Sequence, residues 1–278
     1  MDKITWTDMV IAAVAVLAFF RPDFTRLYQK LFRKGKVQIR RNNKMELGYT
    51  GYGHTLTLNL SLVAENEDVF IDSMLLVITN LQTNQNSRFN WFAIKDPTKS
   101  GSDNNQAIIE EPCGFLLKKD TSKTLTISFG DQNTASILDS RILPILEELK
   151  ARIKPEAEII REKGKSVEGI FQKQLFTGFY DTKVKELKES EELKKSSGIF
   201  AELFYWNPGK YHADIILSSF KPKSENKYSF NFEISKPDST KLYKNIEIAN
   251  ERFIHSIINA ATSDDPIFNF IYLDYELI

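Results

Sequence analysis

The segment Thr55-Leu-Thr-Leu-Asn-Leu-Ser-Leu-Val-Ala64 alternates leucine with small polar residues. Side chains at every second position of a β-strand point to the same face, and here those positions are Leu56, Leu58, Leu60 and Leu62. The pattern predicts an antiparallel strand with one buried and one wet face. The glycines of residues 48–53 resemble a phosphate-cradling loop, but such loops precede a helix. Because a strand follows, a glycine turn is the favoured interpretation.

The sequence around this strand predicts a β-sandwich-like unit over residues 37–132. Val69 to Leu81 is apolar on both faces, as expected for a central strand, and Asp96 to Gln106 reads as a polar loop. Asn42-Asn43 predicts a hairpin turn between two short strands. The remaining expected strands are Val37 to Arg40, Met45 to Leu47, Arg88 to Ile94, Pro112 to Leu117 and Lys123 to Phe129.

Residues 133–197 form a helical insert, because their apolar residues recur at helical spacing. Pro144 either kinks the first helix or starts its main part, and a break is expected near Gly164. Asp181 to Lys195 is rich in lysine and glutamate, which indicates a solvated helical face or a partner-binding arm. The apolar positions that set the first helix are Leu138, Ile142, Ile145, Leu146, Leu149 and Ile153.

Residues 198–278 predict a second β-rich unit with a helix. Asn207-Pro-Gly is expected to join the strands Ile199 to Trp206 and Lys210 to Ser218 as a hairpin. Ser235 is a candidate helix N-cap. Further expected elements are the strand Tyr228 to Ile234, a helix at Phe253 to Ala261 and the strand Ile267 to Leu277. The fold class is therefore mainly β with a helical insert (α+β), with one or two antiparallel β-sandwich-like units joined by helices.

Residues 1–36 predict a membrane anchor followed by a basic amphipathic helix. Residues 4–20 would make about 25 Å of helix, near the lower limit for a membrane span. A signal peptide cleaved after Val16-Leu17-Ala18 and an ordinary buried helix are the alternatives. Eight basic residues against Asp23 follow Phe20, so the positive-inside rule places the N-terminus outside and the body in the cytoplasm.

An amphipathic helix over residues 24–34 would lie on the anionic inner leaflet of the plasma or inner membrane. A helix packed on the soluble body is the alternative, and nucleic acid is not expected as a partner. The predicted membrane-binding residues are Trp6, Phe19, Phe20, Arg21, Phe24, Arg26, Leu27, Tyr28, Lys30, Leu31, Phe32, Arg33 and Lys34.

Charge is divided unevenly along a chain whose formal net charge is zero. The first 41 residues hold nine basic and three acidic side chains, which leaves 28 basic and 34 acidic for the rest. The body, at −6, should therefore stand off an anionic membrane that attracts the first 41 residues, at +6. Cys113 is the single cysteine, which excludes an intrachain disulfide framework and fits a reducing compartment.

Candidate catalytic residues are scattered, and no cofactor, metal site or small-molecule substrate is identified. His54, His212 and His255 lie in three different segments without metal-ligand spacing. Cys113 has no base that the sequence can place beside it. The acidic pairs Glu110-Glu111 and Asp264-Asp265 are weak signals for a hard cation. The sequence therefore predicts no enzyme.

Three functions remain open. The first is a membrane-anchored cytoplasmic adaptor, scaffold or sensor that holds a protein partner, and an edge strand such as Tyr228 to Ile234 could pair with that partner. The second is a membrane effector in which residues 4–34 self-associate and perturb the bilayer. The third is an enzyme whose site is assembled from scattered residues.

Overall fold

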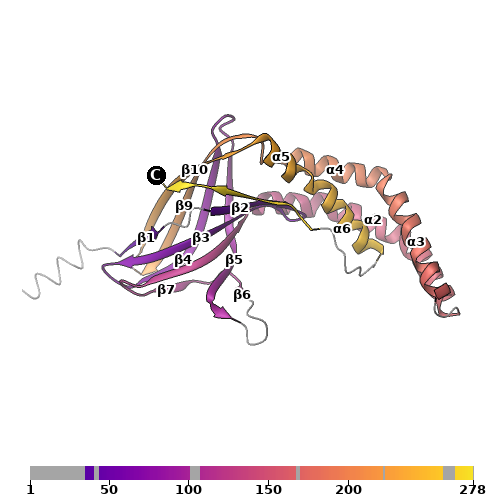
Figure 1. Ribbon diagram of the computed structural model, residues 1–278, viewed down its shortest axis with the longest axis horizontal. Helices are drawn as coiled ribbons and strands as arrows, with labels where there is room; N and C mark the ends of the chain where they lie inside the picture. The colour runs from indigo at the N-terminus through magenta and orange to yellow at the C-terminus, as the bar shows by residue number, and fades with distance from the viewer. Residues whose placement is uncertain are drawn as a thin grey trace, which may run out of the picture.

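One curled antiparallel sheet, with helices gathered at one end, forms the body (Figure 1). The computed structural model describes residues 35–40, 44–100, 107–166, 170–221, 223–258 and 267–277. This mixed α+β architecture confirms the antiparallel strands and the helical insert predicted from the sequence.

The strands are β1 (Lys36–Arg40), β2 (Lys44–Thr50), β3 (Gly53–Glu65), β4 (Val69–Asn80), β5 (Asn86–Ser100), β6 (Ala107–Glu110), β7 (Phe115–Leu117), β8 (Ser122–Gly130), β9 (Gly209–Lys221), β10 (Ser224–Ile234), β11 (Phe270–Asp274) and β12 (Glu276–Leu277). The helices are α2 (Gln132–Lys165), α3 (Ile170–Lys188), α4 (Glu191–Leu203), α5 (Lys236–Tyr243) and α6 (Asn245–Ile258).

Strands from both β-rich regions share a single sheet instead of forming one or two sandwich-like units. The order is β11-β2-β3-β8-β5-β4-β9-β10-β12, with β1 on β3, β6 on β5 and β7 on β4. The central strand β4 pairs with β5 before the helical insert and with β9 after it. Alternating apolar residues predict that one face of a strand is buried, but they do not determine whether a second sheet or the same sheet packs on that face. Here the sheet curls so that its inner face covers itself.

Strand β3 confirms its sequence pattern, because its four leucines are fully buried. The expected hairpin at Asn42-Asn43 is wrong, since β1 and β2 do not pair with each other. Both pair with β3, β1 along Ser61–Glu65 and β2 along Gly53–Leu58. The hairpin instead joins β2 to β3 through residues 51–52, with Gly53 at a φ of 96°, a value that favours glycine.

The C-terminal segment connects the two ends of the curled sheet. Its β11 pairs with β2, and its β12 pairs with β10 after the single residue Tyr275. Tyr275 is buried, and its ring centroid lies 4.7 Å from that of Phe230. Part of the β10 edge that the sequence left open to a partner is therefore occupied by the chain itself.

Asp131 is the N-cap of helix α2, and its carboxylate accepts hydrogen bonds from the backbone N–H groups of Asn133 and Thr134. Its buried stripe contains all six apolar positions predicted from the spacing. Pro144 and Pro155 both lie inside the helix, so Pro144 does not start it. The predicted break near Gly164 is confirmed, because α2 ends at Lys165.

The expected strand Ile199 to Trp206 is wrong. Residues up to Leu203 belong to α4, and 204–207 are extended but unpaired in the sheet. The side chains of Phe204, Tyr205 and Trp206 are buried inside the curl, where Trp206 stacks on Phe89, whereas Asn207 is exposed. β-branched and aromatic content suggested a strand, but the aromatic rings here fill the core. Asn207-Pro-Gly consequently links a helix to β9 and is not a hairpin turn.

Other boundaries are closer to expectation. Strand β5 runs to Ser100, so the start of the expected loop Asp96 to Gln106 is a strand, and residues 101–106 lie outside the described part. Ser235 is the N-cap of α5, as predicted, and the C-terminal helix α6 starts at Asn245, earlier than predicted.

The predicted anchor and all thirteen predicted membrane-binding residues lie in 1–34, outside the described residues. In the part of the chain that the structure describes, no helix is both long and apolar enough to span a bilayer.

Candidate functional site

Two glycines create a depression on the outer face of the sheet. Gly48 and Gly130 flank Thr55 in one row across β2, β3 and β8. A β-carbon at Gly48 would lie 2.6 Å from the ring of Phe270, and one at Gly130 would lie 3.2 Å from the ring of Phe92. Each glycine is therefore covered by a phenylalanine from the neighbouring strand. Thr55 forms the floor between the two rings.

A β-bulge places Phe92 over Gly130. Across the β5–β8 ladder, Trp91 pairs with Phe129 and Ala93 with Ser128, so Phe92 is the extra residue. Bulges redirect side chains and are frequent beside functional sites. Phe89 and Trp91 face the core, so alternation turns Phe92 outward, and the bulge lets the next residue, Ala93, lie opposite Ser128 on the same outer face.

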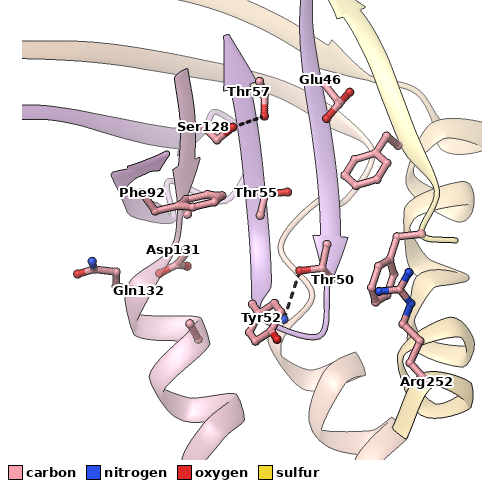
Figure 2. A pocket seen from close by; sticks show the side chains of 14 residues that line it. Glu46, Thr50, Tyr52, Thr55, Thr57, Phe92, Ser128, Asp131, Gln132 and Arg252 are labelled. Atoms are coloured by element: carbon pink, nitrogen blue, oxygen red, sulfur yellow. Dashed lines mark hydrogen bonds between the residues drawn. The ribbon is translucent and has the colours of Figure 1, made fainter. Parts of the chain in front are cut away.

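The depression widens into a groove of about 660 Å³ (Figure 2). In the next row of the sheet, Thr57 and Ser128 hydrogen-bond to each other across 3.1 Å. The groove is mostly apolar, although several hydroxyl groups face it. It is lined by Glu46, Thr50, Tyr52, Thr55, Thr57, Phe92, Ser128, Gly130, Asp131, Gln132, Ala135, Arg252, Phe268 and Phe270.

One wall is the N-terminus of α2. The carboxylate of Asp131 caps this helix and also accepts a hydrogen bond from the Thr134 hydroxyl at 2.7 Å. The side chain of Gln132 accepts a hydrogen bond from Asn90 on β5. Asp131 is thus engaged in holding the wall, and its backbone N–H is bonded to the carbonyl of His54 on β3. This wall is fixed to the floor of the groove.

Asn245 holds the opposite wall. Its side-chain N–H₂ donates to the carbonyls of Tyr49 and Asn269, at 2.9 and 2.8 Å. Its side-chain oxygen accepts from the Asn269 N–H at 2.7 Å. These bonds fix the chain on both sides of Asn269, which presents Phe268 and Phe270 to the groove. Asn245 itself is buried, so it is a positioning residue.

Three charged residues line the groove: Asp131 is engaged in capping α2, whereas Glu46 and Arg252 lie at separate points of the rim. The guanidinium carbon of Arg252 lies 4.4 Å from the centroid of the Phe268 ring. Figure 2 shows Glu46 near one end of the groove and Arg252 near the other. No histidine or cysteine occurs among the described residues that line the groove. The arrangement suits binding of an apolar group, with one anionic and one cationic contact at the rim.

His54 lies beneath the groove and is not part of its surface. It is buried, stacks on Tyr49 at 4.5 Å, and its Nε2 accepts the Tyr205 N–H at 2.9 Å. This acceptor role requires the neutral tautomer with hydrogen on Nδ1. Burial lowers the pKa of His54 to about 3. His54 lies two residues before Leu56, so the alternation of this strand places both side chains on its buried face.

The other candidate residues lie apart from the groove. His212 on β9 contacts Asn231 at 2.7 Å and Asp214 at 3.2 Å, and His255 contacts the ring of Tyr180. Cys113 is free and exposed. Glu110 and Glu111 lie on the β6 side, and Asp264 and Asp265 fall outside the described residues. Where the chain is described, no group of three or more candidate metal ligands is present.

The sequence reasoning did not find this groove. The glycines of residues 48–53 predict a turn, and the structure confirms one at residues 51–52, next to the strand that holds Gly48. The adjacent aromatics Trp91-Phe92 interrupt the two-residue period of β5, and this was the signal for the bulge. The pairing of Gly48 and Gly130 on either side of Thr55 depends on strand order, which the sequence did not give.

In comparisons with known proteins, no family model, curated protein or solved structure matches this chain.

Proposed function

We propose that this chain is a membrane-tethered interaction protein, and that the groove binds an apolar segment of a polypeptide partner. Residues 4–20 would anchor it in the inner or plasma membrane, with the N-terminus outside and the body in the cytoplasm. Residues 24–34 would contact anionic lipid. The protein would act as an adaptor, scaffold or sensor without catalysis of its own.

The groove's aromatic walls are the observation that carries the proposal. Phe92 on β5 is 48% exposed, and Tyr52 in the turn between β2 and β3 is 80% exposed, although the sheet beneath them has a filled core. Exposed aromatic side chains on a pre-formed surface are typical of interaction sites. A bulky apolar side chain between the rings of Phe92 and Phe270 would remove them from water.

The position of the groove fits a tether at the N-terminus. Lys36 pairs with Glu65, at one end of β3, whereas Thr55 lies ten positions along the same strand. At about 3.3 Å per residue, the groove is roughly 30 Å from the point where the described chain begins. A partner could therefore reach the groove without contacting the membrane surface.

The ligand class follows from the lining. The floor is made of neutral hydroxyl groups and glycine backbone, so it offers no cluster of positive charge for a phosphate group. The groove crosses several strands and is open along its length, which suits an extended or helical segment. Arg252 and Glu46 at the rim would favour an acidic and a basic residue flanking the apolar one.

Selection of peptides from a random display library against the purified full chain tests the groove. Enriched peptides should share a bulky apolar residue, and Thr55→Trp, which fills the floor, should weaken their binding at least about tenfold. Thr124→Trp on the same outer face of β8, away from the groove, is the matched control and should bind normally. Enriched peptides that bind Thr55→Trp and wild type equally would refute the groove as the site.

The tether is tested separately. Protease added to intact cells should spare the body, and protease added to inside-out vesicles should digest it, with Met1 still at the N-terminus. Deletion of residues 1–36 should release the protein from the membrane fraction. A body that is digested in intact cells, or a new N-terminus near Phe19, would contradict this topology.

A further inference from the structure

Helix α5 places lysine side chains beside one wall of the groove. Phe268 and Phe270 line the groove, whereas Asn269 between them lines a second hollow of about 560 Å³. Only the strand segment that leads into β11 separates the two concavities. We call the second one the lysine hollow. It is lined by Lys236, Pro237, Thr240, Lys241, Lys244 and Asn269.

The three lysines share the exposed side of α5. At about 100° per residue, Lys236, Lys241 and Lys244 fall within an arc of about 140°, opposite to the buried residues of the helix. Asp238 is the acidic residue of α5, and its carboxylate accepts a hydrogen bond from the Ser235 hydroxyl at 2.6 Å. No carboxylate occurs among the described residues that line the hollow. The hollow therefore presents three positive charges and no negative one.

Lys241 connects this charge to the wall of the groove. Its Nζ donates a hydrogen bond to the backbone carbonyl of Phe270 at 2.9 Å. Because the Phe270 ring lines the groove, an ammonium group lies within one residue of the aromatic surface. Arg252, over the ring of Phe268, adds a further positive charge on the same side. The wall formed by this strand segment and its neighbouring helices is therefore basic.

A polypeptide with acidic residues next to a bulky apolar one matches this arrangement. The apolar side chain would enter the groove, and the carboxylates would reach the lysines across the strand segment. Beyond residue 41 the chain carries 28 basic and 34 acidic side chains, a net charge of −6. This body would repel a long polyanion such as nucleic acid, whereas a short acidic segment would lie within the basic patch.

We propose that the partner of the groove is an acidic polypeptide segment. Its bulky apolar residue fills the groove, and its aspartate or glutamate side chains bind in the lysine hollow. The acidic residues lie on the side of the apolar one that faces α5, so charge and apolar contact together fix the orientation of the segment. This proposal rests on the groove as the binding site of the partner.

Peptide selection with cross-linking tests the contact. Peptides enriched on the purified full chain should carry acidic residues beside their apolar one. A carbodiimide joins a carboxylate directly to a lysine amine that it contacts. The enriched peptides should therefore be cross-linked to Lys236, Lys241 or Lys244, as identified by mass spectrometry after digestion.

Charge reversal supplies the second test. Lys236→Glu combined with Lys244→Glu should weaken these peptides at least about tenfold at about 50 mM salt, and by less at about 500 mM, because salt screens exposed charges. Lys241 stays in place because it holds the wall. Lys118→Glu combined with Lys223→Glu is the matched control, since it changes the net charge equally at exposed positions at the other end of the sheet. The control should bind normally, and circular dichroism confirms that both variants are folded.

The outcomes separate this proposal from the groove itself. Peptides that lose binding in Thr55→Trp but bind the Lys236 and Lys244 variant normally would overturn the acidic contact and leave the groove as the site. Peptides insensitive to Thr55→Trp would refute the groove, and this proposal with it. Cross-links only at lysines outside α5 would also overturn it. So would a single-stranded RNA that displaces the peptides and loses its own binding in the lysine variant.

Discussion

The groove and the distal part of the α2–α3 hairpin, which we call the arm (residues 154–166 and 170–182), both expose phenylalanine, but what lies beneath the two surfaces differs. Phe92 at the groove stands on a sheet whose inner face is filled by fully buried side chains such as Phe129 and Trp206. Phe171 on the arm stands on the distal parts of α2 and α3, where no apolar side chain of residues 154–166 or 171–182 whose burial is described is buried. An exposed aromatic ring on a rigid support indicates a pre-formed binding surface. The same ring on the arm has little buried apolar structure directly beneath it.

The largest expected loss of stability should come from a substitution in the core beneath the groove, and a substitution on the arm should have little effect. Trp206→Ala removes the ring that stacks on Phe89 and the N–H that donates to the Gly48 carbonyl at 2.9 Å. It should lower the free energy of unfolding by about 3–5 kcal/mol. Phe171→Ala on the arm should change it by less than about 0.5 kcal/mol, because Phe171 is 72% exposed. Denaturant titration measures both, and equal losses would contradict the comparison.

Acid should weaken the support of the groove through His54. Its pKa is about 6.5 in the unfolded chain and is lowered to about 3 by burial in the folded one. The stabilisation is complete above pH 6.5 and is lost as pH falls toward 3, by about 1.4 kcal/mol per pH unit.

His54→Gln keeps an acceptor for the Tyr205 N–H but does not titrate. Between pH 7 and pH 5 the wild type should therefore lose about 2 kcal/mol more stability than the variant. Denaturant titration at the two pH values supplies the measurement. Parallel losses in both proteins would show that His54 does not govern this pH dependence.

Loss of the Asn245 hydrogen bonds should loosen one wall of the groove. Asn245→Ala leaves the carbonyl of Tyr49 and the N–H of Asn269 without these partners, and should reduce stability by about 1–3 kcal/mol. Hydrogen exchange should quicken in β11 and leave the arm unchanged. Asn86→Ala, which alters an exposed pair with Thr79, is the control and should have little effect. Exchange that quickens equally throughout the chain would refute a local role.

Lys183 on α3 forms an ion pair with Glu156 on α2 at the base of the arm, and loss of this side chain's charge should affect the arm alone. Lys183→Met breaks the ion pairs with Glu156 and Glu186 but keeps most of the apolar side chain. Because both carboxylates are about half exposed, the expected loss of stability is only about 1 kcal/mol. Hydrogen exchange should become faster in α3 before Lys183 and remain unchanged in β3. Faster exchange in β3 would show that the arm and the sheet are one cooperative unit.

The smallest effect on stability should accompany a clear effect on binding. Phe92→Ala removes a half-exposed ring and should change the free energy of unfolding by less than about 1 kcal/mol. It should nevertheless weaken the peptides selected against the groove at least about tenfold. Leu116→Ala, a similarly exposed change on β7, should leave peptide binding intact. Unchanged binding in Phe92→Ala would remove this ring from the site.

Local periodicity predicted much of the secondary structure. The alternating leucines of β3 and the helical spacing in α2 were sufficient because each element buries one face against the core. Ser235 was recognised as an N-cap because its hydroxyl can accept the backbone N–H of Asp238. The prediction of a strand from Ile199 to Trp206 was wrong, because aromatic content alone does not distinguish a strand from the end of a helix whose side chains fill the core.

The groove could not be predicted, because it depends on which strands are neighbours. Phe270 and Gly48 are far apart in the sequence, yet they occupy facing positions on β11 and β2. The bulge at Phe92 shifts one side chain relative to β8, and a shift of one residue exchanges the faces of a strand. Neither effect has a local cause that a reading of neighbouring residues would detect.

The amino-acid order alone was sufficient for most of the antiparallel strands, for the helical insert between them and for the separate positions of the three histidines in the sequence. These depend on hydrophobic period, capping and spacing, which are properties of neighbouring residues. The joining of both β-rich regions through β4, the closure by β11 and β12, and the groove across β2, β3 and β8 were decided by the folded chain. Such contacts join residues that are distant in sequence, and their energies depend on the packing of the whole sheet.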